Sequence, residues 1–93
     1  MVVGTLEVRV VIRHSQSLKD KRRVLLSLKD RIRNEFEVSC AEVDHQDSLK
    51  EGVLGVAICG TDSRVLDGVL QKIVGLVRRE RDAELADFAI EWR

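Results

Sequence analysis

The stretch VVGTLEVRVVIR (residues 2–13) alternates between apolar and polar side chains and is rich in β-branched residues. Its apolar face carries Val2, Leu6, Val8, Val10 and Ile12, and its polar face carries Thr5, Glu7, Arg9 and Arg13. Alternation with a period of two is typical of a strand that has one face on a core and the other toward water. The sequence therefore predicts that the chain opens with a half-buried β-strand.

Two segments with helical spacing are expected further along the chain. The first covers residues 18–36, with Ser17 as N-cap and Asp20 as a shorter version of the capping-box partner. Its apolar stripe consists of Leu18, Val24, Leu25, Leu28, Ile32 and Phe36. The second follows the capping residues 61–63, and its apolar residues recur at helical spacing from Leu66 to Val77. Each helix can therefore bury one side.

Three more segments have the length and pattern of strands, at residues 37–45, 53–60 and 84–92. The resulting order is β-α-β-β-α-β. Right-handed crossovers and a central hairpin fold this order into a ferredoxin-like α+β sandwich. We expect one domain over residues 1–93, with a four-stranded antiparallel sheet in the order 4-1-3-2 and both helices on one face.

The composition restricts the classes of function. Sixteen basic and sixteen acidic residues cancel, so any attraction to nucleic acid or membrane must come from a local cluster of charge. Two cysteines, Cys40 and Cys59, are too few for a zinc motif. No targeting or membrane-spanning pattern is visible. We therefore expect a reduced, cytoplasmic protein that has no metal and no cofactor.

Basic residues crowd the start of the first predicted helix, where the helix dipole favours acidic ones. Each exposed cation there costs about 0.3–1 kcal/mol. These basic residues and two cations further along the helix form a candidate site for nucleic-acid phosphates. The site consists of Lys19, Lys21, Arg22, Arg23, Lys29 and Arg33. The alternative is a solvated helix face that Asp20, Asp30 and Glu35 neutralise.

Two other places invite a functional interpretation. Asp44, His45 and Asp47 could hold a metal ion, or His45 could act as a general base, although such residues also serve ordinary turns. The open face of the sheet is the second place, because small apolar residues there could support self-association into a homodimer. Those residues are Val3, Val11, Val53, Ala57 and Cys59.

Two known uses of this fold are excluded by the sequence. An RNA-recognition motif stacks bases on aromatic residues of its strands, but the first and third predicted strands have no aromatic residue. Acylphosphatases have a similar layout, yet their Gly-Val-x-Phe-Arg loop after the first strand is absent, and the segment IRHS (residues 12–15) does not replace it.

Three segments together resemble the YlxP-like family of small bacterial proteins: QSLKDKRRVLLSLKDRIRNEF (residues 16–36), AEVDHQD (residues 41–47) and LGVAIC (residues 54–59). The resemblance implies a ferredoxin-like fold. It also implies a role near the ribosome, since the genes of this family often lie beside those for translation initiation and ribosome-maturation factors. We therefore expect a non-enzymatic domain that binds structured RNA or a ribosomal surface. The alternatives are a homodimeric regulatory module and a small hydrolase centred on Asp44 and His45.

Overall fold

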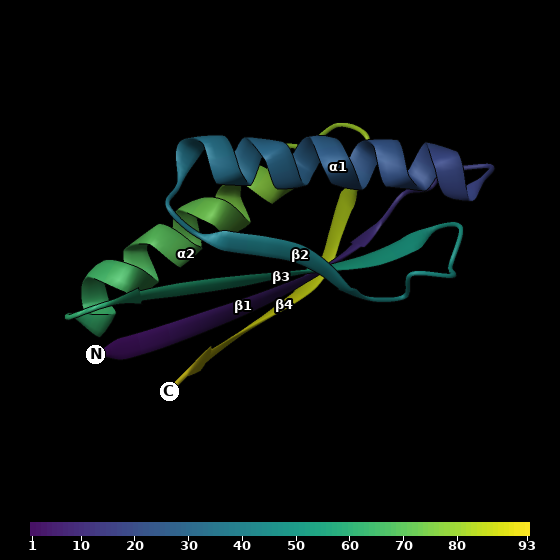
Figure 1. The fold of residues 1–93 in the computed structure, drawn as a ribbon. Coiled ribbons are helices and arrows are strands. Elements are labelled where there is room, and N and C mark those ends of the chain that lie inside the picture. Colours follow the sequence, from purple (N-terminus) through teal and green to yellow (C-terminus); the bar gives the residue numbers. More distant parts are fainter.

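The computed structural model describes residues 1–93 and has the predicted order of elements (Figure 1). These are β1 (Val2–Val11), α1 (Leu18–Glu35), β2 (Ser39–Asp44), β3 (Glu51–Gly60), α2 (Ser63–Arg78) and β4 (Glu84–Trp92). The strands form one antiparallel sheet in the order β2-β3-β1-β4, and both helices lie on one face of it. The ferredoxin-like prediction is confirmed, and so is the strand order.

The predicted alternation of the first strand is also confirmed. β1 lies inside the sheet, paired with β3 from Val2 to Val11 and with β4 on its other side. Leu6, Val8 and Val10 are fully buried under the helices, whereas Glu7 and Arg9 on the opposite face are exposed. The strand ends at Val11, two residues before the predicted boundary, although the Ile12 N–H still donates a hydrogen bond to the Lys50 carbonyl at 2.7 Å.

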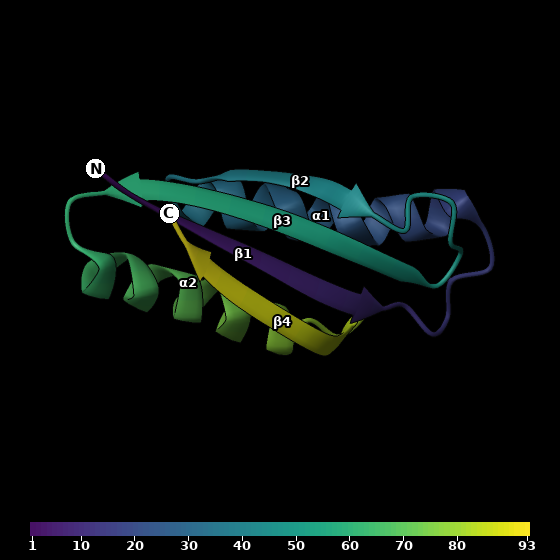
Figure 2. The ribbon, with the colours of Figure 1, turned by 90° about the horizontal axis from the view of Figure 1, so that it is seen from below.

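The two helices cover different halves of the sheet. α1 packs on β2 and β3, and α2 packs mainly on β1 and β4 (Figure 2). Ser17 caps α1 as predicted, since its hydroxyl accepts a hydrogen bond from the Asp20 N–H at 3.1 Å. The Asp20 carboxylate reaches the Gln16 N–H at 3.2 Å and so completes the cap. Neither helix is long and apolar enough to cross a membrane.

A glycine on β3 lets α1 lie close to the sheet. A Cβ atom added to Gly52 would lie 2.8 Å from Leu25 Cδ1, well inside contact distance. Leu25 is buried in the core, so its side chain cannot move into solvent. Gly68, in contrast, lies on the exposed side of α2, and a Cβ atom there would meet nothing within 4 Å.

The same substitution at these two glycines should change stability in opposite directions. Gly52→Ala overpacks the contact with Leu25 and should destabilise the protein by about 1–3 kcal/mol. Gly68→Ala adds a strong helix former at an open position and should stabilise it by about 0.5–1 kcal/mol. Urea unfolding of both variants measures this. A loss of stability in Gly68→Ala, or none in Gly52→Ala, would contradict the packing described.

Candidate nucleic-acid interface

One cation of the predicted site lies inside the protein. Lys21, in the second turn of α1, is fully buried. Its ammonium donates a hydrogen bond to the His45 carbonyl at 2.5 Å and lies 3.2 Å from Glu42 Oε2. The prediction that Lys21 contacts phosphate is therefore wrong, because the charge is enclosed and paired. Lys21 instead joins the start of α1 to β2 and to the turn that follows it.

The acidic partner of Lys21 depends on this contact. Glu42 Oε2 is buried and accepts no hydrogen bond, so the ammonium of Lys21 compensates its charge directly. The carbonyl of His45 also accepts the Ser48 N–H at 3.1 Å, which closes the turn between β2 and β3. His45 has a φ of 58°, a left-handed conformation that non-glycine residues adopt rarely. The turn is thus strained, and Lys21 helps to hold it.

The sequence contains a signal for this contact. Lys21 stands four residues before Leu25 and seven before Leu28, which places it on the buried stripe of α1. Glu42 stands two residues after the buried Cys40, so it shares the inner face of β2. A cation and an anion on two inward faces are expected to pair, because neither can remain unpaired there.

The other basic residues of α1 remain at the surface. We use the name α1 ridge for the row that runs along the β2 side of the helix and consists of Arg22, Leu26, Lys29 and Arg33. Arg22, Leu26 and Lys29 line a shallow hollow of about 210 Å³ between the helix and the sheet. Leu26 is 53% exposed. Lys19 and Arg23 lie beside this ridge, and Arg23 is paired with Asp20 at 3.1 Å.

The far end of the α1 ridge is attached to the edge of the sheet. The guanidinium of Arg33 donates a hydrogen bond to the Cys40 carbonyl at 2.6 Å. Burial raises the pKa of the Cys40 thiol, and the positive charges of Arg33 and Lys29 work against that rise. Cys40 is therefore a thiol of low reactivity in the core, and the two cations lie near it along β2.

In the acidic turn that follows β2, several polar groups make hydrogen bonds that shape the turn. The Asp44 carboxylate accepts a hydrogen bond from the backbone N–H of His45 at 2.8 Å. The Ser48 hydroxyl accepts hydrogen bonds from the N–H groups of Lys50 and Glu51. No group of three or more histidine, cysteine or carboxylate side chains is placed to share a metal ion. The Asp44 carboxylate and the His45 backbone thus help to shape the turn.

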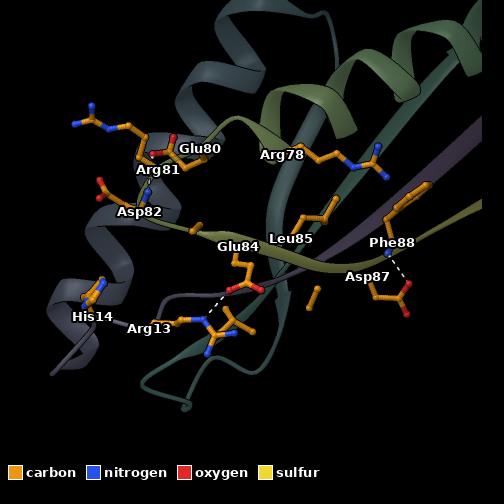
Figure 3. A pocket seen from close by; sticks show the side chains of 13 residues that line it. Arg13, His14, Arg78, Glu80, Arg81, Asp82, Glu84, Leu85, Asp87 and Phe88 are labelled. Atoms are coloured by element: carbon orange, nitrogen blue, oxygen red, sulfur yellow. Dashed lines mark hydrogen bonds and ion pairs between the residues drawn. The ribbon is translucent and has the colours of Figure 1, made fainter.

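A larger hollow, of about 790 Å³, lies at the other side of the molecule, where α2 ends and β4 begins (Figure 3). In Figure 3, Arg13 reaches Glu84, at 2.6 Å, and Arg78 lies over the ring of Phe88, 5.8 Å from its centre. The hydrogen bond from Arg13 lowers the pKa of the Glu84 carboxyl. Because acidic residues line this hollow as densely as basic ones, it attracts neither sign of charge strongly.

The open face of the sheet differs from the predicted apolar patch. Val53 lies on this face as expected, since it pairs with Arg9 of β1, but it is only 7% exposed. Asp44 pairs with Val53 across the irregular end of the β2–β3 ladder, and His45 lies against the same hollow. Along β1, the charged residues Glu7 and Arg9 separate Val3 from Val11. Val3 and Val11 are therefore not contiguous, whereas Ala57 shares a hollow with Ala41, Val43 and Gly55.

Comparisons with known proteins agree with this fold and leave the function open. The model of a family described as "Protein of unknown function (DUF503)" matches residues 3–90. The chain is 28% identical to the uncharacterized protein YlxP of Bacillus subtilis (strain 168) over 91 residues, which cover 98% of this chain and 99% of the relative.

Two solved structures share the fold at low sequence identity. The de novo designed protein Foldit4 has a TM-score of 0.57 and 10% identity, with 100% of this chain and 97% of that chain covered. A REP-associated tyrosine transposase bound to a REP hairpin has a TM-score of 0.50 and 12% identity, with 98% of this chain and 55% of that chain covered. Likeness at this identity concerns the fold alone.

Removing the buried ammonium should weaken the fold strongly. Lys21→Met keeps most of the apolar stem but leaves the Glu42 carboxylate without its counter-charge. Breaking a buried pair in this way costs about 3–5 kcal/mol, and the lower end is expected because 24% of the Glu42 side chain is exposed. Lys19→Met, at an exposed position of the same helix, should change stability by less than about 0.5 kcal/mol.

Chemical unfolding of Lys21→Met and of the double variant Lys21→Met/Glu42→Met distinguishes a charge effect from lost packing. The double variant should regain most of the lost stability, because replacing both partners by apolar residues removes the uncompensated charge. Equal losses in the single and double variants would show that the ion pair is not what holds α1 to the turn.

Proposed function

Because this chain belongs to the DUF503 family, whose function is unknown, we propose its function from its own surface. It acts as a binding domain rather than an enzyme, and it contacts structured RNA, such as ribosomal RNA, through the α1 ridge. Lys19 and Arg23 extend the contact surface at the start of the helix. The proposal includes a cytoplasmic location, where Cys40 and Cys59, which form no disulfide with each other, would stay reduced.

The observation that carries the proposal is the set of unpaired cations on α1. Lys19, Arg22 and Lys29 have no carboxylate oxygen within ion-pair distance. Elsewhere on the same helix, Arg31 is paired with Glu80 at 2.5 Å and Arg23 with Asp20. Lys19, Arg22 and Lys29 also lie on one side of the helix, so they present their charges together. Several free cations on one side of a helix suit phosphate groups.

The geometry of α1 favours binding because the helix is fixed along its length. The buried Lys21 attaches its first turns to the β2–β3 turn, Arg31 attaches its outer side to the segment before β4, and Arg33 attaches its end to β2. A rigid array of cations loses less conformational entropy on binding than a flexible tail does. Arg22 and Lys29 are seven residues apart, about 10 Å along the helix axis.

A role near the ribosome is consistent with the resemblance described above. The net charge of zero also fits a local contact and not a general attraction to polyanions. The hydrolase alternative has no support from the turn at Asp44 and His45, whose carboxylate and carbonyl are engaged in hydrogen bonds within the protein. RNA contact through α1 therefore explains the exposed cations of that helix, whereas catalysis at the turn has no structural feature to support it.

Reversing two cations of the ridge tests the proposal. Arg22→Glu/Lys29→Glu should abolish binding to ribosomal RNA in a filter-binding or co-sedimentation assay, because the phosphate contacts become repulsive. For the parent, the slope of log affinity against log salt should be near 0.7–0.9 per phosphate contact. Stability should remain equal or rise slightly, since Arg22 lies near the start of the helix, where an acidic residue is favoured, and Lys29 is an exposed position without an ion pair.

A matched control is available at the second helix, with Lys72 on α2 and Arg79 as its C-cap. Lys72 and Arg79 are also seven residues apart, both are exposed, and neither has a carboxylate partner. Lys72→Glu/Arg79→Glu makes the same change in net charge and should leave RNA binding within about twofold of the parent. If the two double variants lose binding equally, the effect belongs to net charge and α1 is not the site.

A further inference from the structure

The free edge of β4 presents unpaired backbone groups over a long stretch. Arg93 and Val3 exchange two backbone hydrogen bonds, at 2.8 and 2.9 Å, so the N–H and C=O of Arg93 point toward β1. In an antiparallel ladder this direction alternates from residue to residue. The backbone groups of Trp92, Ile90 and Phe88 therefore point outward, to the side of the sheet where no further strand lies (Figure 2).

The same three residues form an apolar row beside that edge. Their side chains are on the helix side of the sheet, where α2 covers them incompletely. Trp92 is 40% exposed although its ring packs on Gly4, and Phe88 and Ile90 are partly buried. An exposed strand edge with apolar side chains is a template for pairing with another strand.

The opposite edge of the sheet lacks these features. β2 has six residues against nine in β4. The Arg33 guanidinium already binds the Cys40 carbonyl on β2, and the ladder is irregular between Glu42 and Asp44. Short length, a bulge and side-chain capping are the means by which proteins protect a sheet edge. On β4, such protection is confined to a bulge near its start, between the partners of Arg9 and Val10, and to the Phe88 N–H, which donates to the Asp87 carboxylate.

We propose that a second copy of this chain pairs with β4 in antiparallel orientation, with the twofold axis at Ile90. In this register Ile90 lies opposite Ile90 of the partner subunit, and Phe88 lies opposite Trp92 of the partner subunit. The outward backbone groups of these three residues then bond across the axis. The two sheets become one sheet of eight strands, and all four helices lie on the same face.

Charge complementarity fixes this register. On the open face of the sheet, the same axis places Asp87 opposite Arg93 of the partner subunit, and Ala89 opposite Glu91 of the partner subunit. Two pairs of opposite charge form, and no like charges lie directly opposite one another. A shift of the register by two residues in one direction would place Asp87 opposite the partner's Glu91. A shift in the other direction would leave Asp87 without the partner's Arg93 opposite it.

Asp87 would change its contact when the dimer forms. In the single chain its carboxylate accepts the outward N–H of Phe88 at 2.8 Å and so shields the edge. Arg93 lies 3.7 Å from Glu91 in the same state. In the dimer, the Phe88 N–H donates to the carbonyl of the partner's Trp92 instead. The carboxylate of Asp87 then contacts the partner's Arg93.

Charge reversal on this edge tests the inference in the full chain. Sedimentation equilibrium of the parent should show a dimer at micromolar concentration. Asp87→Arg and Arg93→Asp should each raise the dissociation constant at least tenfold, because each sets like charges opposite one another. The double variant Asp87→Arg/Arg93→Asp should return it to within about threefold of the parent. Both residues are exposed, so the variants should fold.

Asp44→Arg is the matched control on the other edge. The Asp44 carboxylate also accepts the N–H of the residue after it, at 2.8 Å, so this variant loses the same local bond and changes charge equally. It should leave the dimer intact. A parent that stays monomeric at several hundred micromolar overturns the inference. So does a double variant that remains as weak as the single ones, or an Asp44→Arg variant that dissociates as readily as Asp87→Arg.

Discussion

The buried ammonium of Lys21 is the contact on which the arrangement of α1 depends. It joins three elements at one point: the first turns of α1, the inner face of β2 at Glu42 and the turn carbonyl of His45. A charge can remain in such a place only when its partners are fixed around it. The contact therefore sets where α1 lies on the sheet, and so which of its cations face water.

Much of the fold could be predicted because it depends on periodicity. The alternation through Leu6, Val8 and Val10 identified the half-buried strand, and helical spacing identified both helices. The charged residues were harder to place, since a list of cations on a helix does not name their partners. Lys21 was assigned to the surface by its charge, although its spacing to Leu25 put it on the inner stripe. The place of Val53 on the open face was predicted, but its burial was not, because the irregular end of the β2–β3 ladder is not visible in the sequence.

The two proposed interfaces lie on opposite sides of the molecule and share no residue. The α1 ridge runs along the β2 side, where free cations are held on a rigid helix. The free edge of β4 is at the other end of the sheet, where apolar side chains and backbone groups lie together. Pairing through β4 would leave both α1 ridges accessible, at the two outer ends of a longer sheet. Two copies could then contact one extended RNA, which strengthens binding without any new contact in either site.

Ultraviolet crosslinking of the protein to ribosomal RNA, with mass spectrometry of the crosslinked peptides, tests the central claim most directly. The claim is that Lys21 stays inside while the neighbouring cations of α1 meet the RNA. The account predicts nucleotide adducts on the segment from Arg22 to Arg33, and none on the strands of the open sheet face. Adducts confined to that face or to β4, with α1 free of them, would contradict it.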